Sequence, residues 1–301
     1  MPLIRPWARQ AGRSGGATGI CGQGFRQTAG RALVRRPGGF TLVELIMVIA
    51  LAGIVAAMVG SVLSRPLQGF ADNSQRSELT DLATIALNRL ARDIRLAVPN
   101  SVSVAAAGDE IRFVPIAAAG RYRANQPIPD GPRQDPPACT QPSGPCVIDI
   151  LSPIEPADSE SKHWLIIYNT DALVGRAEPV DGAVSPVSPK AFTWKDGVLE
   201  AELSAFRFEF ASPQHRFFLA DRAVGYRCQA GALVRAEFDE LAASDYSTAA
   251  TVVDHVDCSQ SRFTYEPGNN SRHGLVTLKL VLAGAGGTLT LLQQVQVDNA
   301  P

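Results

Sequence analysis

Apolar and polar positions follow three different patterns along the chain. From Leu45 to Ser64 there are twenty residues without a charge, and a helix of that length spans about 30 Å, the hydrocarbon thickness of a bilayer. No polar face recurs with a helical period in this run. It therefore predicts a membrane-spanning helix rather than the core helix of a soluble domain.

A second helical pattern follows in "SELTDLATIALNRLARDIRLAV". Its apolar residues recur at spacings of three and four, which places them on one stripe of a helix that packs on a sheet. Pro99-Asn100 predicts the end of this helix. The predicted stripe consists of Leu79, Ala83, Ala86, Leu90, Ile94 and Ala97.

Beyond residue 100 the period changes to two, which is typical of strands. In "AFRFEFA" the pattern places Phe206, Phe208 and Phe210 on one face, and "GAGG" at 284–287 predicts a hairpin between the last two strands. Segments 117–145 and 177–189 are rich in Pro, Gly and Ala and predict irregular loops. The candidate strands are "SVSVA", "EIRFVP", "VIDIL", "HWLIIYN", "AFRFEFA", "RFFLA", "VGYRC", "RFTYEP", "GLVTLKLVLA" and "TLTLLQQVQV".

Together these patterns predict an α+β fold: a long N-terminal helix, transmembrane in its first half and amphipathic in its second, packed on an antiparallel β-sheet domain. Residues 1–39 hold seven Arg and no acidic residue, so the positive-inside rule keeps that end in the cytoplasm and exports the rest. A secretory signal cleaved after Ala50-Leu51-Ala52 is the alternative. The apolar run continues well past that site, however, and Glu44 would interrupt the signal.

The residues "GGFTLVELIMVIALAGIVAAM" resemble the prepilin motif of type IV pilins and type II secretion pseudopilins. The resemblance implies that a prepilin peptidase cuts between Gly39 and Phe40 and methylates the new amine of Phe40. It also implies that the carboxylate of Glu44 pairs with the Phe40 amine of a neighbouring subunit, so that an acid that is costly in lipid is satisfied in the filament. The alternative is an interfacial Glu44 that reaches water.

The resemblance divides the chain into four parts. We expect a cytoplasmic leader at 1–39 that is removed, a transmembrane and assembly helix at 40–65, an amphipathic periplasmic helix at 66–100 and a β-rich periplasmic domain at 101–301. A leader of 39 residues is long for this family. Either translation starts at Val34, which leaves a six-residue leader, or the extra residues form an unstructured cytoplasmic extension.

Charge and cysteine content agree with export. Removal of the seven leader arginines leaves 21 basic residues against 29 acidic ones, a formal charge of −8, which argues against nucleic-acid binding. Cys21 leaves with the leader, and four cysteines remain, which suggests two disulfides in an oxidising compartment. Three connectivities are possible. We expect Cys139–Cys146 and Cys228–Cys258, the alternative being free buried thiols.

Catalytic and metal-binding patterns are absent from the sequence. The four histidines (163, 215, 255 and 273) lack the spacing of paired metal ligands, and no nucleophile elbow occurs. The acidic segment "EPADSE" at 155–160 is a minor candidate for Ca²⁺, because some pseudopilins bind calcium, although such loops are usually only solvated. We therefore expect no enzyme activity, no cofactor and no metal.

The end of the second helix, "LNRLARDIRLAVPNSV", resembles both J-type pseudopilins and MSHA minor pilins, and "LTLLQQVQVDNAP" is most similar to the MshO group of MSHA minor pilins. The implied function is a minor structural subunit that primes or caps an MSHA-type pilus. A J-type minor pseudopilin of a type II secretion system is the close alternative, and a membrane-anchored periplasmic enzyme is a distant one. The implied partners are prepilin peptidase, other major and minor pilin subunits, the inner-membrane assembly platform and the lipid bilayer.

Mass spectrometry of the mature chain tests the predicted processing. We expect an N-methylated Phe40 at the N-terminus, because the motif places the cut after Gly39. An N-terminus at Gly53 would show secretory signal cleavage instead and would contradict the resemblance.

Overall fold

The computed structural model describes residues 38–151, 153–154, 159–268, 272–284 and 287–300, with only the helical backbone for 63–72. Most of the predicted leader, residues 1–37, therefore lies outside the described residues. The chain divides into two compact units between Gly60 and Ser61. The helix α1, Leu42–Arg95, begins in the first unit and ends in the second.

In the first unit the apolar run forms the beginning of α1. From Leu42 to Val62 the helix is strongly apolar, and none of this stretch is buried inside the fold. Among the described residues, this stretch is the single candidate that is long and apolar enough to cross a membrane as a helix. An apolar surface on every side of a helix is stable in lipid and unfavourable in water.

In the second unit the remaining part of α1 supplies one wall of a core. Ala83, Leu90 and Ile94 are fully buried, and the predicted stripe is confirmed with Leu87 and Ala91 added to it. The helix ends at Arg95, before the predicted stop at Pro99. The predicted segments 40–65 and 66–100 thus belong to one continuous helix.

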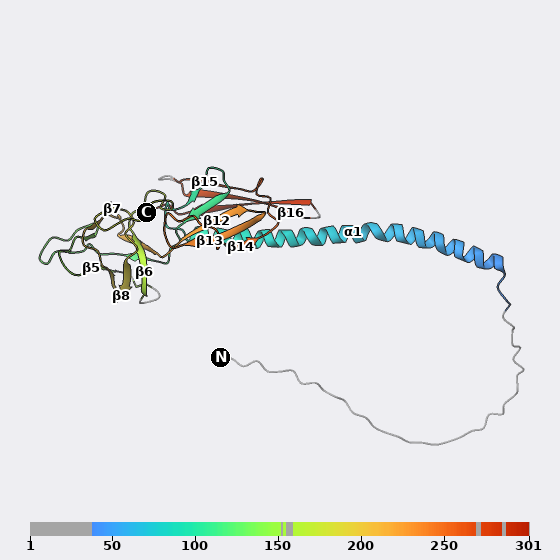
Figure 1. The fold of residues 1–301 in the computed structure, drawn as a ribbon, viewed down its shortest axis with the longest axis horizontal. Coiled ribbons are helices and arrows are strands. Elements are labelled where there is room, and N and C mark those ends of the chain that lie inside the picture. The colour runs from blue at the N-terminus through green and yellow to red at the C-terminus, as the bar shows by residue number, and fades with distance from the viewer. Residues whose placement is uncertain (1–37, 152, 155–158, 269–271, 285–286, 301) are drawn as a thin grey trace, which may run out of the picture. The chain divides into compact units, whose positions relative to one another are not determined.

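Two antiparallel sheets pack on this stripe. Their inward residues and those of α1 form a single hydrophobic cluster. Figure 1 shows the end of α1 lying against these strands. One sheet has the order β1 (Ser103–Val104), β2 (Glu110–Phe113), β12 (Ala223–Gln229), β13 (Ala232–Phe238) and β14 (Ala250–Val253), and the other has the order β15 (Arg262–Glu266), β16 (Gly274–Gly284) and β17 (Gly287–Val297).

Two further sheets build a second region, which Figure 1 shows away from the helix. They enclose a core of their own, and a third cluster joins this region to the helix-packed one. The six-stranded sheet has the order β3 (Ala118–Arg121), β11 (Arg216–Ala220), β6 (Ser159–Ile166), β8 (Phe192–Lys195), β9 (Val198–Ala201) and β5 (Cys146–Asp149). The three-stranded sheet has the order β4 (Ala138–Cys139), β10 (Phe206–Phe208) and β7 (Val184–Ser185), with β10 and β7 parallel.

The predicted fold class is confirmed: a helix on a mostly antiparallel β-sheet domain. Several details differ. Phe206 and Phe208 are buried, but β10 ends at Phe208 and Phe210 is 48% exposed. The predicted loops 117–145 and 177–189 contain the short strands β3, β4 and β7, whose pairing partners β11 and β10 are distant in sequence. The strands β8, β9, β13 and β14 were also not predicted, although β8–β9 and β12–β13 are local hairpins with two-residue connections.

Substitution of Leu90 by Ala tests the role of the stripe. Leu90 is fully buried against both sheets, so we expect a loss of about 2–5 kcal/mol in the free energy of unfolding. Ile85→Ala is the matched control in the same helix, because Ile85 is 67% exposed and a surface change costs within about 0.5 kcal/mol. Thermal or denaturant unfolding of the detergent-solubilised chain measures both, and equal effects would contradict the packing.

Candidate functional site

The predicted cleavage site lies immediately before α1. Gly39 and Phe40 precede the helix in non-helical backbone, and Phe40 is 81% exposed. No described atom lies within 4 Å of the position that a side chain at Gly39 would occupy. The bond between Gly39 and Phe40 is thus open to a protease within the described chain.

Thr41 caps the N-terminus of α1. Its Oγ1 accepts a hydrogen bond from the backbone N–H of Glu44 at 3.2 Å, and its carbonyl accepts one from Leu45. Thr41 and Glu44 therefore occupy the Ncap and N3 positions, where Thr and Glu are preferred, and the Thr41 half of a capping box is formed. This structural role of "TLVE" was not recognised from the sequence, although the spacing of Thr and Glu is its signature.

Glu44 lies in the first turn of α1, where the helix dipole favours a negative charge. Among the described residues its carboxylate has no hydrogen bond or ion pair, and the surrounding side chains of the helix are apolar and exposed. An ionised carboxylate in such a segment costs about 2.5–3.5 kcal/mol at the centre of a bilayer and less near its edge. A cationic partner from outside the chain removes that cost.

Both predicted disulfides are present. Cys139 of β4 is bonded to Cys146 of β5, with the two Cα atoms 5.0 Å apart, and this bond joins the three-stranded and six-stranded sheets of the second region. Cys228 of β12 is bonded to Cys258, with Cα atoms 5.5 Å apart. Since Cys258 precedes β15, this bond ties together the two sheets that pack on α1.

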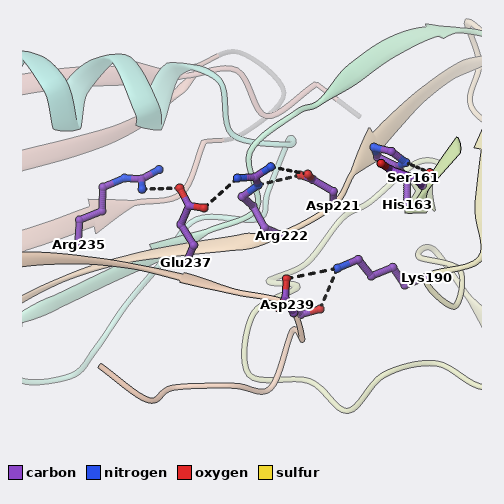
Figure 2. Close-up of polar contacts among 8 residues, drawn as sticks. All are labelled: Ser161, His163, Lys190, Asp221, Arg222, Arg235, Glu237 and Asp239. Atoms are coloured by element: carbon purple, nitrogen blue, oxygen red, sulfur yellow. Dashed lines mark hydrogen bonds and ion pairs between the residues drawn. The ribbon is translucent and has the colours of Figure 1, made fainter. Parts of the chain in front are cut away.

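A row of ion pairs crosses the turn between β11 and β12, as Figure 2 shows. Arg235 Nη1 donates to Glu237 Oε1 at 2.6 Å, and Arg222 Nη1 donates to Glu237 Oε2 at 2.8 Å. Arg222 also donates from Nε and Nη2 to the two oxygens of Asp221, at 3.0 and 2.6 Å. Because Asp221 and Arg222 form the connection between the two strands, this row links the helix-packed sheet to the six-stranded one.

The same row reaches α1 through Asp93. Arg235 Nε and the hydroxyl of Tyr226 donate to Asp93 Oδ2 at 3.1 and 2.7 Å. Burial, followed by this hydrogen bond, raises the pKa of Tyr226 above its ordinary value of 10.0. The sequence analysis did not find this network, and the spacing of Arg235 and Glu237 on one face of β13 is its local signal.

Hydrogen bonds from arginine lower the pKa of the Glu237 and Asp221 carboxylates. The hydrogen bond from Arg235 is the main cause for Glu237, and the hydrogen bond from Arg222 is the main cause for Asp221. His163 lies near Asp221, and burial lowers the pKa of its imidazole, whose Nδ1 is 2.7 Å from the carbonyl of Ser161. In Figure 2 Lys190 approaches Asp239 in a separate pair.

The four histidines lie apart, each in a local contact: His215 pairs with Asp135, His255 with Asp254 and His273 with Asp298, while His163 packs edge-on against Trp194. Within the described residues no group of three His, Cys, Asp or Glu is arranged to hold a metal ion. The acidic segment named as a calcium candidate falls largely outside them, since 155–158 are not described.

The ion-pair row predicts a pH dependence of stability. A carboxylate whose pKa is lowered in the folded state stabilises the protein above the unfolded pKa, and this contribution is lost as the pH falls through the folded pKa. We expect Glu237→Gln to lower the unfolding temperature by about 1–4 °C at pH 7. The difference from wild type should shrink as the pH falls below the ordinary value of 4.5.

Glu240→Gln is the matched control, because Glu240 is exposed and its carboxylate has no partner among the residues that the structure describes. Thermal unfolding of the detergent-solubilised variants at pH 3 to 7 measures the effect. A constant difference between Glu237→Gln and wild type over this range would contradict the pairing.

Comparison with protein families finds that residues 34–60 match the prokaryotic N-terminal methylation motif. No curated protein and no solved structure matches the chain. The matched residues contain Gly39, Phe40, Thr41 and Glu44 together with the start of the apolar helix, which fits a single-pass membrane anchor. The motif implies processing by prepilin peptidase and assembly with other pilins, and it supports a structural subunit that is a type IV pilin-like or pseudopilin protein.

Proposed function

We propose that the chain is a minor pilin-like subunit that is cleaved between Gly39 and Phe40, N-methylated at Phe40 and incorporated in an MSHA-type type IV pilus, where it primes or caps the filament. The observation that carries the proposal is the unpartnered carboxylate of Glu44 at the start of an apolar helix inside the methylation motif. The amine of Phe40 on a neighbouring subunit is a cation of the right kind in the right segment.

Burial in a bundle of subunits strengthens this attraction, because opposite charges interact more strongly at low dielectric than in water. The capping of α1 by Thr41 supports the same arrangement, since it holds the helix start, and with it Glu44, in a regular geometry. Each subunit then offers a carboxylate in its first helical turn and an amine four residues before it.

The size of the second unit supports a minor rather than a repeating subunit. The sheets β3–β11–β6–β8–β9–β5 and β4–β10–β7 add a second core beyond the one that α1 needs for its own burial. This region adds loops and strands away from the helix, where they are suited to the end of a filament. In this proposal residues 66–301 lie in the periplasm and then on the pilus at the cell surface.

A J-type minor pseudopilin of a type II secretion system is the alternative, because the residues around the end of α1 resemble both groups. Both proposals share prepilin peptidase, an inner-membrane assembly platform and other pilin-like subunits as partners. No catalytic role is proposed for any residue. Identification of the co-purifying subunits, from a pilus or from a secretion system, decides between the two.

Substitution of Glu44 tests the pairing. Glu44→Gln keeps the size and the capping preference of the side chain but removes its charge, so we expect normal cleavage and easier membrane insertion but reduced incorporation into filaments. Glu44→Leu removes the hydrogen-bonding group as well. Immunoblots of cleaved subunit in membranes and in sheared filaments measure the two steps.

Thr41→Ala is the matched control, because it removes the cap, at a cost of about 0.5–2 kcal/mol to the helix start, and leaves the carboxylate in place. We expect it to assemble better than Glu44→Gln. Equal filament incorporation of Glu44→Gln and wild type would show that Glu44 is an interfacial residue that reaches water, and would defeat the pairing.

A further inference from the structure

A cationic cavity lies where the loop before β4 meets β10. Its volume is about 390 Å³, which is within the range of about 300–1,000 Å³ that is usual for small-molecule sites. Arg133 of the loop and Arg207 of β10 both line it, and Asp135 is the one acid among the described residues of the lining. The cavity belongs to the second region and involves neither α1 nor the methylation motif.

The acid in the lining is already satisfied by the protein. Asp135 Oδ1 accepts a hydrogen bond from the hydroxyl of the buried Tyr122 at 3.0 Å, and Asp135 Oδ2 lies 3.0 Å from Nε2 of His215. Because each carboxylate oxygen has its own partner, Asp135 does not need either arginine of the cavity. The positive charge of the lining is therefore available to a ligand.

The two arginines are held in different ways. Arg133 Nη1 donates to the carbonyl of Ala124 at 2.6 Å and lies 4.0 Å from Asp149 Oδ2, so the protein positions this guanidinium. Arg207 is exposed, and its side chain has no hydrogen bond or ion pair among the described residues. Its backbone is fixed in β10 between β4 and β7. One anchored and one free guanidinium thus line the same cavity.

Buried contacts hold the loop that forms the wall of the cavity. Asn125 is 3% exposed, and its side chain bonds to both backbone groups of Ala138: Nδ2 donates to the carbonyl at 2.7 Å, and Oδ1 accepts from the N–H at 2.9 Å. The next residue, Cys139, is bonded to Cys146. A ligand binds to a wall that the fold holds in place at a lower entropic cost than to a mobile loop.

Further arginines strengthen the positive field near the cavity. Arg121 of β3 stands directly opposite Arg216 of β11, and like charges in opposite positions destabilise a sheet. Arg123 follows on the same face, and its N–H donates to the carbonyl of Asp149, the residue beside Arg133. A surface of one charge raises the local concentration of ligands of the opposite charge.

The remaining lining indicates which kind of anion fits. Pro136, Pro137 and Phe208 supply apolar surface, and Gln134 supplies an exposed amide that both donates and accepts hydrogen bonds. A planar guanidinium pairs with a carboxylate through two parallel hydrogen bonds. A ligand with a carboxylate, hydroxyl groups and an apolar ring face therefore matches every part of the lining. A sugar acid carries all three on one compact ring.

We propose that this cavity binds a sugar acid, either free or as a unit of an acidic polysaccharide. The carboxylate pairs with Arg133 and Arg207, the apolar face of the ring lies on Pro136 and Pro137, and the hydroxyl groups bond to Gln134. Contact with the prolines stabilises the complex because it removes apolar surface from water. This role goes beyond the proposed function and does not depend on it, since every residue of the cavity lies in the second region.

Isothermal titration calorimetry of the detergent-solubilised full chain tests the class of ligand. We expect saturable binding of galacturonate and about tenfold weaker binding of galactose, which lacks the carboxylate, and of glutarate and inorganic phosphate, which lack the ring. Equal binding of glutarate or phosphate would show an adventitious ion only and would overturn the proposal. Absence of galacturonate binding, or equal binding of galactose, would overturn it as well.

A second titration, with oligogalacturonate, distinguishes the two sources of the sugar acid. If the natural ligand is a polysaccharide, we expect the oligomer to bind more tightly than the monomer, because further carboxylates reach Arg121 and Arg123. Equal affinity, counted per site, identifies the free acid. Both outcomes support a sugar-acid site.

Arg207→Gln tests the site itself. It removes the free guanidinium, so we expect about tenfold weaker binding of galacturonate and an unchanged unfolding temperature. Arg207→Lys keeps the charge but not the planar fork and should bind with intermediate affinity. Arg89→Gln is the matched control, because Arg89 is exposed on α1 and does not line the cavity. Equal binding by Arg207→Gln and Arg89→Gln would overturn the proposal, and the ligand series on wild type decides if a variant does not fold.

Discussion

Burial of the apolar stripe of α1 is the interaction on which the second unit depends. Ala83, Leu90 and Ile94 are fully buried between two sheets, and each such leucine or isoleucine side chain contributes about 1.5–3 kcal/mol when it is removed from water. The inward faces of both sheets share one hydrophobic cluster with this stripe. The disulfide Cys228–Cys258 closes the two sheets on the helix, and the second region is joined to this core through the cluster around Trp164 and Phe218.

Two carboxylates of the helix α1, Glu44 and Asp93, lie in very different surroundings. At one end Glu44 stands in an apolar segment and its carboxylate has no partner among the described residues. At the other end Asp93 receives hydrogen bonds from Tyr226 and Arg235 and begins a row of ion pairs that continues through Glu237. In the proposed function the first carboxylate favours assembly, whereas the second links α1 to the sheet that it packs on.

The free edge of β17 is a further feature at the surface of the unit. A neutral edge of eleven residues, with no strand on its other side in the described structure, is a hazard in an isolated protein. The cavity lined by Arg133 and Arg207 is a second surface feature, and it gives the second region a role that does not depend on how subunits assemble.

The sequence by itself determined the elements that rest on local patterns: the membrane-length run, the stripe of α1, the β17 hairpin and the methylation motif, because periodicity and motif spacing are properties of neighbouring residues. It also indicated both disulfide pairs. Only the tertiary structure decided what depends on distant residues. The short strands β3, β4 and β7 form in segments rich in Pro and Gly because a partner strand supplies their hydrogen bonds. Phe210 leaves the face of Phe206 because β10 ends early. The ion-pair row joins residues 93, 222 and 235 across three elements, and only its Arg235–Glu237 pair has a local spacing.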